Sequence, residues 1–574
     1  MKTTRLGPLL AIVLVASSPA LRSQNAVTPG DVALARKSIF SPESGATLPP
    51  EKTRLLDTNH DGVLTLEDLN GLPSSRSRWK TLFVAPSQPA NFQNTQPLGS
   101  YANPFVLTES STRDFYDQIR KITFPPGKNA GLNAEVIFLP GTYQRIELLL
   151  RNADSQPTAG KPPIKAVIDR FRPVRLFLRS LYPLSNDPQK VACFFGASQG
   201  ADPAGILKYG PVQRLKTDGP DGGAPYFLQI QGDGTTAPKN KISGITVSGL
   251  KITCYRSGID LLYASKIVLK NNLLDTLGSA RTPEESAAPS DKTAAMYGTS
   301  AIGMARLCEN ILIKHNRIVN AWNRYNSPAP KPGGDPGLMH PFYIIDASNI
   351  VYLDNTIENS SGPQFKVVDL PAYSPDGAPI PGTPRLGRQV LINNSFLQST
   401  DRLAGLYPVE FDTIAMIHDN SAQVRFWPDK KIYTKPSPPA ANFVFLGNTW
   451  ETKIAMPFLR RESVTTSADG VPHIPARFPN WIFEGNKWIG FKPGPTIVER
   501  RRGTPISERK DITREVTTNP DETIRLQSVD HPYPYEKCLQ RLRELVTASP
   551  IQPIDRTLLD IVEKKEISGV STDN

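Results

Sequence analysis

The chain has 574 residues, too many for one compact core, so its length indicates either several domains or a solenoid that grows by stacking. Lysine and arginine total 66 against 54 acidic residues, which gives a net charge of +12. This charge favours acidic partners, the alternative being a basic, soluble surface that binds no partner. No RNA-binding, zinc-finger or basic-helix motif accompanies this charge, which argues against nucleic acid, and four cysteines cannot supply a disulfide framework.

The first 23 residues have the pattern of a signal peptide. Lys2 and Arg5 precede the apolar run from Leu9 to Ala16, and small residues follow up to Ser23, where a signal peptidase can cut. This run is shorter than the roughly 20 residues that cross a bilayer, and no later segment is apolar enough to do so. We therefore predict a signal peptide at 1–23 and a secreted or periplasmic product without a membrane span.

Residues 57–68 match the twelve-residue EF-hand calcium loop at its first, third, fifth and sixth positions. Calcium prefers several oxygen ligands, and the segment offers them from Asp57, Asn59, Asp61, the carbonyl of Val63, Thr65 and Asp68. Helices are expected from Glu51 to Leu56 and from Leu66 to Leu69. We predict that residues 45–75 form a Ca2+-binding segment, the alternative being an Asx-rich surface turn.

The last position of this loop departs from the EF-hand pattern, because Asp68 stands where a bidentate glutamate is usual. In this respect the segment resembles the calcium loops of dockerins and of other exported bacterial modules. A single loop of this kind is more typical of a structural staple or attachment module than of a calcium sensor. The sequence does not connect it to catalysis.

A repeat of six short segments dominates the centre of the chain. Each segment has apolar residues at alternate positions, then an asparagine (once Ser395), then the start of another strand. Asparagine suits such a bend because it tolerates left-handed backbone angles, and its amide can bond to the same amide one coil away. The pattern predicts a parallel β-helix with an asparagine ladder. The segments are 266–272, 310–316, 349–355, 389–395, 442–448 and 480–486.

Long insertions separate the repeated segments. Successive ladder positions lie 44, 39, 40, 53 and 38 residues apart, more than the roughly 20 to 25 residues of a bare coil. Each coil should therefore carry a long loop, and proline-rich stretches lie in these intervals. Companion strands are predicted between the repeats, beginning at Gly258, Ala301, Pro341, Gln364 and Pro408.

The repeat, the turn Leu139 to Tyr143 and the C-terminal pattern Leu542 to Val562 together resemble the pectate-lyase-like superfamily. The resemblance covers about two thirds of the chain, and it specifies fold better than substrate. It implies an all-β solenoid, a right-handed parallel β-helix with long loop insertions over residues 85–500. A C-terminal extension with helices is expected over 501–574. This scaffold carries lyases, hydrolases, epimerases and non-enzymatic adhesins alike.

The companion strands predict a row of outward side chains. If the apolar residues face inward, their next neighbours form a column with a spacing of about 4.8 Å. Lys366 is the candidate base of this column, because a lysine beside other cations or partly desolvated can lose its proton near neutrality. The alternative is an ordinary solvated lysine. The predicted column is Asp260, Gly303, Tyr343, Lys366 and Glu410.

Further residues complete the predicted site. Tyr343 can pass a proton to the leaving oxygen, and His340, three residues earlier, can act as acid or base in place of Lys366 or be satisfied at a turn. Arg388 and Arg425 can neutralise a substrate carboxylate. The resemblance implies a lysine or arginine base with calcium bridging that carboxylate.

These observations predict an exported, monomeric lyase that cleaves an acidic, uronate-containing polysaccharide by β-elimination. No cofactor besides Ca2+ is indicated. A non-catalytic carbohydrate-binding or cell-surface protein is the second interpretation. A glycoside hydrolase or uronate epimerase is the third, because a hydrolase needs two carboxylates and the clusters typical of polygalacturonases are absent from the sequence.

Overall fold

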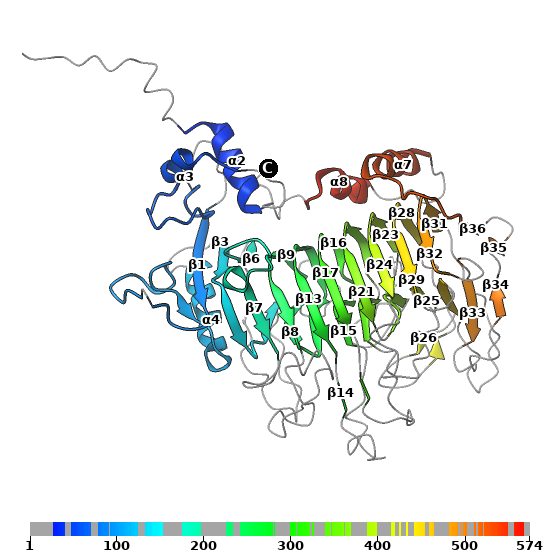
Figure 1. The fold of residues 1–574 in the computed structure, drawn as a ribbon, viewed down its shortest axis with the longest axis horizontal. Coiled ribbons are helices and arrows are strands. Elements are labelled where there is room, and N and C mark those ends of the chain that lie inside the picture. The colour runs from blue at the N-terminus through cyan, green and yellow to red at the C-terminus, as the bar shows by residue number, and fades with distance from the viewer. Residues whose placement is uncertain are drawn as a thin grey trace, which may run out of the picture. The chain divides into compact units, whose positions relative to one another are not determined.

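In the computed structural model (Figure 1) the chain divides into two compact units, Met1–Arg78 and Trp79–Asn574. The predicted signal peptide lies outside the described residues. None of the described helices is long and apolar enough to cross a membrane. The structure describes residues 27–40, 47–70, 78–90, 92–123, 132–152, 175–196, 226–232, 241–278, 280–281, 299–305, 307–321, 324–325, 339–345, 347–360, 362–368, 387–398, 415–419, 424–425, 432–433, 441–453, 458–463, 481–491, 495, 497–501, 510–512, 515–519, 522–548 and 556–567.

The first unit contains two short helices, α2 (Pro29–Phe40) and α3 (Pro50–Leu56). A proline begins α3, where its fixed φ suits the first helical turn. An ion pair joins the helices, since Lys52 Nζ lies 3.3 Å from Asp31 Oδ2. The helix expected before the calcium loop is therefore confirmed, whereas the segment after the loop, 66–70, forms a turn and not the expected helix.

The second unit is the predicted parallel β-helix, built from three stacked sheets. All strands of the first sheet are parallel to their neighbours. In spatial order they are β2 (Phe105–Val106), β1 (Trp79–Ala85), β3 (Asn133–Phe138), β6 (Leu176–Ser180), β9 (Ile242–Ser248), β12 (Ala264–Lys270), β16 (Glu309–Lys314), β20 (Ser348–Leu353), β23 (Gly387–Ile392), β28 (Ala441–Leu446) and β31 (Trp481–Glu484).

The second and third sheets follow the same order of coils. The second sheet contains β4 (Gly141–Gln144), β7 (Ala192–Phe195), β10 (Lys251–Thr253), β13 (Leu273–Leu277), β17 (Arg317–Ala321), β21 (Thr356–Ser360), β24 (Ser395–Gln398), β29 (Thr449–Thr452) and β32 (Lys487–Ile489). The third sheet contains β5 (Leu148–Asn152), β8 (Tyr226–Gly232), β11 (Ser257–Leu262), β15 (Thr299–Ala305), β19 (Met339–Ile345), β22 (Phe365–Val368), β25 (Ala415–Asp419), β30 (Leu459–Ser463), β33 (Ile497–Arg501) and the antiparallel β34 (Lys510–Ile512).

The chain also contains smaller sheets and helices besides the three long sheets. Three two-stranded sheets pair β14 (Ala280–Arg281) with β18 (Arg324–Tyr325), β26 (Val424–Arg425) with β27 (Ile432–Tyr433), and β35 (Glu515–Asn519) with β36 (Glu522–Arg525). The helices are α4 (Thr112–Thr123), α7 (Tyr535–Ala548) and α8 (Arg556–Lys564), with 3-10 turns η2 (Glu109–Ser111) and η3 (Pro188–Lys190).

Apolar side chains from all three sheets fill one continuous interior. Each coil buries its inward face against the coils before and after it, as expected for a solenoid. Phe396 and Trp450, which are opposite each other in register, stack with their ring centres 4.0 Å apart. Helix α4 adds Phe115 and Ile119 to this interior beside β1 and β3.

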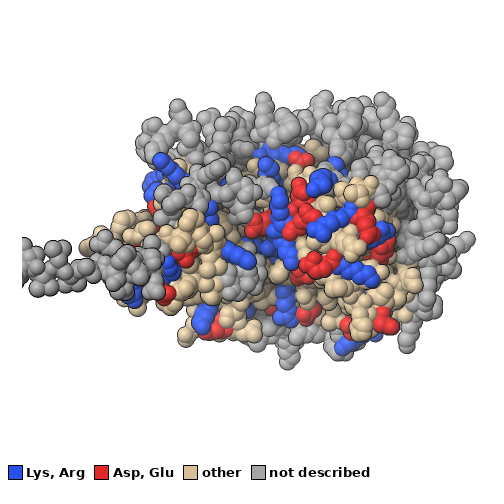
Figure 2. Space-filling model, turned by 90° about the horizontal axis from the view of Figure 1, so that it is seen from above, with Lys and Arg blue, Asp and Glu red and all other residues tan. Residues whose placement is uncertain are grey.

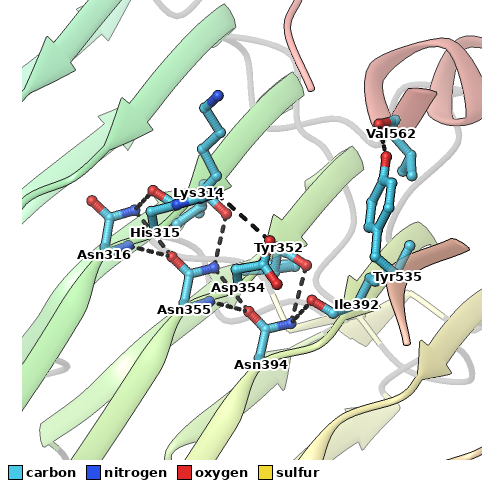
Figure 3. Close-up of polar contacts among 11 residues, drawn as sticks. Lys314, His315, Asn316, Tyr352, Asp354, Asn355, Ile392, Asn394, Tyr535 and Val562 are labelled. Atoms are coloured by element: carbon cyan, nitrogen blue, oxygen red, sulfur yellow. Dashed lines mark hydrogen bonds and ion pairs between the residues drawn. The ribbon is translucent and has the colours of Figure 1, made fainter. Parts of the chain in front are cut away.

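The predicted asparagine ladder is confirmed (Figure 3). Along it, each side-chain Nδ2 donates to the Oδ1 of the next coil at 2.9 to 3.1 Å. The left-handed backbone angle falls on the residue before each asparagine, not on the asparagine as expected; His315, for example, has φ +55°. Gly447 and Gly485 occupy that position in the last coils, where a side chain would collide with Tyr533. The ladder consists of Asn272, Asn316, Asn355, Asn394, Asn448 and Asn486.

The fourth repeat was predicted one residue out of register. Asn394 holds the ladder position, and Ser395 begins the next strand. The error arises because Gln389, which looks like the polar start of the repeat, lies opposite Ile350 and is buried. Its amide oxygen accepts a hydrogen bond from Tyr352 Oη at 3.1 Å, whereas its buried Nε2 has no hydrogen-bond partner among the described residues.

The C-terminal helices α7 and α8 pack against the outer face of the first sheet. Their apolar residues cover valine and leucine side chains of β12, β16, β20, β23 and β28. Arg541 of α7 donates two hydrogen bonds, of 2.7 and 2.8 Å, to the carboxylate of Glu484. Tyr535 Oη donates to the carbonyl of Val562 at 2.6 Å (Figure 3). Figure 2 shows acidic and basic side chains interspersed over the face seen from above.

Candidate functional site

The outward column of the third sheet is confirmed over four of its five predicted members. Asp260 lies opposite Gly303, Gly303 opposite Tyr343, and Tyr343 opposite Lys366 in the parallel register. Neighbouring parallel strands are about 4.8 Å apart, so these residues line one continuous strip. The inward partners, from Ile259 to Phe365, are buried in the core.

The prediction of the fifth member of the column was wrong. Met416 of β25, and not Glu410, lies opposite Lys366. Glu410 lies outside the described residues, as does the strand expected to begin at Pro408. The alternation of Val409 and Phe411 resembles that of Ala415 and Ile417, so periodicity alone could not choose between the two segments.

Asp260 occupies a polar niche that involves the next coil. Ser300 Oγ donates to Asp260 Oδ1 at 3.4 Å. A methyl group at Gly303 would overlap Asp260 Oδ1 and approach Ser300 Oγ to 2.6 Å, so the carboxyl group leans over the glycine toward the next strand. Burial raises the pKa of Asp260 to about 7, against the opposing effects of Ser300 and the charge of Arg256. The protonated form of the carboxyl group is therefore favoured at this position.

His340, Tyr343 and Lys366 form the second part of the site. The His340 side chain is 1% exposed, its Nδ1 lies 3.0 Å from the carbonyl oxygen of Pro363, and its ring centre lies 5.3 Å from that of Tyr343. Lys366 is 7% exposed, and its Nζ lies 5.0 Å from the centre of the Tyr343 ring. Tyr343 is therefore close to an imidazole and an amine that are both largely removed from water.

A second column, three residues earlier along each strand, was missed by the sequence analysis. Ser300 lies opposite His340, and the Ser300 backbone N–H donates to Ser257 Oγ at 3.4 Å. The signal was present, because Ser257, Ser300 and His340 each precede a member of the first column by three residues. Two polar columns therefore run side by side along the third sheet.

The two predicted arginines are not members of these columns. Arg388 is half-buried on β23 of the first sheet with φ +52°. Arg425 lies on β26, and its side chain is outside the described part of the chain. Binding of a substrate carboxylate by Arg388 or Arg425 stays a prediction.

The segment 57–68 closes as a compact loop. Asp57 Oδ2 accepts a hydrogen bond from the Gly62 backbone N–H at 2.9 Å, and Gly62 has φ +83°. Asn59 Oδ1 accepts from the Asp61 N–H at 3.1 Å, and Asp61 Oδ1 accepts from the Val63 N–H at 2.8 Å. The predicted ligands at the first, third and fifth positions thus line one turn.

The carboxyl groups of this loop are incompletely satisfied. Asp57 Oδ1 is buried and has no hydrogen-bond partner among the described residues. Burial raises the pKa of Asp61, and the charges of Asp57 and Asp68 raise it further. Both oxygens of Asp68 are engaged, one by Thr58 and the other by Thr65. Within the described ranges, no three His, Cys, Asp or Glu side chains are already arranged to hold a metal ion.

The four cysteines carry free thiols. Three of them, Cys254, Cys308 and Cys538, are buried, and burial raises the pKa of the Cys254 thiol to about 11. A thiol reacts as its thiolate, so these groups have the character of core residues and not of nucleophiles.

Comparisons with known proteins do not identify the chain. Its sequence matches no protein-family model and no curated protein. Among solved structures, an alginate lyase from Paenibacillus sp. str. FPU-7 is 11% identical with a TM-score of 0.28, over 65% of this chain and 95% of that chain. A DFA-IIIase from Arthrobacter chlorophenolicus A6 is 10% identical with a TM-score of 0.26, over 71% and 94% respectively. At these values the matches establish neither a family nor an activity.

Proposed function

We propose that the chain is an exported lyase that cleaves an acidic, uronate-containing polysaccharide by β-elimination. The observation that carries the proposal is the placement of the Lys366 amine, 7% exposed and 5.0 Å from the centre of the Tyr343 ring, on an outward column of a parallel β-helix. Removal from water disfavours the charged form of an amine, and the neutral amine is the form that accepts a proton. We assign Lys366 as the base.

The remaining residues fit the steps of elimination. Lys366 takes the proton from the carbon next to the substrate carboxyl group, the electron pair forms a carbon–carbon double bond, and the bond to the glycosidic oxygen breaks. His340 is 1% exposed and its ring centre lies 5.3 Å from that of Tyr343, so we assign it a role through Tyr343. Arg388 and Arg425 are proposed to neutralise the carboxylate, and the net charge of +12 attracts the acidic polymer.

A non-catalytic carbohydrate-binding protein is the second candidate. The contact of Lys366 with the Tyr343 ring fits this candidate, because an aromatic ring stabilises the charged amine, and a charged amine binds an acidic polymer without removing a proton. A hydrolase is less well supported, since Asp260 is the one carboxylate among the described members of the column, and hydrolysis requires two.

The test of the lyase proposal compares matched lysine variants. The mature protein is incubated with a panel of acidic polysaccharides, and ultraviolet absorbance of the unsaturated product is recorded. Lys366→Ala should lose activity by about 100-fold or more. Lys251→Ala, on the outer face of the second sheet, should retain it. Equal activity of the two variants would remove Lys366 from the reaction.

We also propose that residues 57–68 bind one Ca2+ as a structural staple. The buried, unpartnered Asp57 Oδ1 fits a cation, and Asn59, Asp61 and the Val63 carbonyl add oxygen ligands. Asp68, with Thr65, would join them after releasing its present hydrogen bonds. The ion would relieve repulsion among the three carboxylates. Calorimetric titration with Ca2+ tests this site independently of any polysaccharide.

A further inference from the structure

From the geometry of the outward column we propose that Asp260 is the proton donor to the leaving glycosidic oxygen, with Gly303 leaving the space that lets its carboxyl group reach the substrate. This role rests on the proposed lyase function. It assigns to Asp260 the step for which Tyr343 was the sequence-based candidate.

The placement of Asp260 relative to Lys366 supports the assignment. Their strands are separated by those of Gly303 and Tyr343, which puts their backbones about 14 Å apart. Both side chains shorten this separation, since the Asp260 carboxyl group leans over Gly303 and the Lys366 amine lies 5.0 Å from the centre of the Tyr343 ring. An acid and a base thus approach Tyr343 from opposite sides along the solenoid.

The surroundings of Asp260 keep a proton available. Burial raises the pKa of its carboxyl group to about 7, and Ser300 Oγ and the charge of Arg256 oppose this effect. Of the residues in register with it, Gln229 of β8 and Gly303 of β15 carry no charge. A general acid works best when its pKa lies near the operating pH, whereas an ordinary tyrosine titrates near 10.

The proton balance of the step is complete. Lys366 gains the proton removed from the sugar carbon, and Asp260 loses its proton to the oxygen of the departing chain. The products are an unsaturated uronate and a chain with a new hydroxyl group. Proton exchange with water then returns the amine and the carboxyl group to their starting forms.

The test measures kcat/KM from about pH 5 to about pH 10 on a polysaccharide that the wild-type protein cleaves. The wild-type activity should fall on the alkaline side with a midpoint near pH 7. Asp260→Asn should lose about 100-fold to 10,000-fold, and its residual activity should lack that alkaline fall. The matched control is Asp275→Asn, because Asp275 also accepts a hydrogen bond from a hydroxyl group, Thr276 Oγ1 at 3.0 Å, but lies on the second sheet.

A second variant keeps the carboxyl group and so addresses the role even if Asp260→Asn fails to fold. Ser300→Ala removes a hydrogen bond that lowers the pKa of Asp260, so the alkaline midpoint should move upward. An unmoved midpoint, or an Asp260→Asn protein with wild-type rate and profile, would overturn the donor role alone. A wild-type protein that releases no unsaturated product would overturn the lyase function, and this role with it.

Discussion

Replacing Asp260 by asparagine should change how the stability of the protein depends on pH. The carboxyl pKa is about 7 in the folded protein, against an ordinary value of 3.8. Because the folded-state value is raised, the group contributes its full stability below about pH 4, and this contribution is lost as pH rises through about 7. The difference between pKa 3.8 and a pKa of about 7 corresponds to about 4 kcal/mol. Asparagine cannot ionise, so the variant escapes that loss.

The assay is urea unfolding of the wild-type protein, Asp260→Asn and the control Asp275→Asn at a series of pH values. The free energy of unfolding of Asp260→Asn, relative to wild type, should rise by about 4 kcal/mol from about pH 4 to about pH 8. Asp275→Asn is the control for replacing an aspartate on another sheet. A constant difference between Asp260→Asn and wild type across the pH series would refute the protonated state of the Asp260 carboxyl group.

Three further perturbations test the asparagine ladder, the space left by Gly303 in the outward column, and the calcium loop. Asn394→Ala should lower the free energy of unfolding by about 3 kcal/mol or more, since it leaves buried ladder groups unpaired, whereas Ser395→Ala should cost less than about 1 kcal/mol; equal losses in urea unfolding would contradict the register. Gly303→Ala should displace the Asp260 carboxyl group and lower the rate of polysaccharide cleavage at least 10-fold. An unchanged rate would show that cleavage does not need the space left by Gly303. Calorimetric titration should show one Ca2+ bound by wild type and none by Asp57→Ala, and heat from the variant equal to wild type would rule out the loop.

The solenoid could be predicted because each coil repeats the same physical problem. Six segments, each a strand followed by a bend, predict a stack in which asparagine amides of successive coils bond to one another. The side-chain hydrogen bonds between successive ladder asparagines, from Asn272 through Asn486, confirm this stack. The predicted register was wrong in the fourth repeat, where a polar residue faces inward. The amide oxygen of Gln389 accepts a hydrogen bond from Tyr352, which belongs to the previous coil, so no local pattern marks the residue as buried.

The site was predictable to the extent that it follows the strand alternation. Asp260, Tyr343 and Lys366 share a column because each is the neighbour of an inward apolar residue. The position of Glu410 could not be fixed, since an insertion of unknown length separates it from the previous strand. The niche of Asp260 depends on Ser300 and the missing side chain of Gly303 one coil later, and such contacts follow only from the register.

The most direct test of the account is to record ultraviolet absorbance and reducing ends together while the mature protein acts on acidic polysaccharides. β-Elimination at the column of Asp260, Tyr343 and Lys366 predicts that both signals rise in parallel in the wild-type protein and that both are lost in Lys366→Ala. Reducing ends without absorbance would contradict the lyase and indicate hydrolysis. Silence on every uronate-containing polymer would contradict catalysis and leave a binding protein.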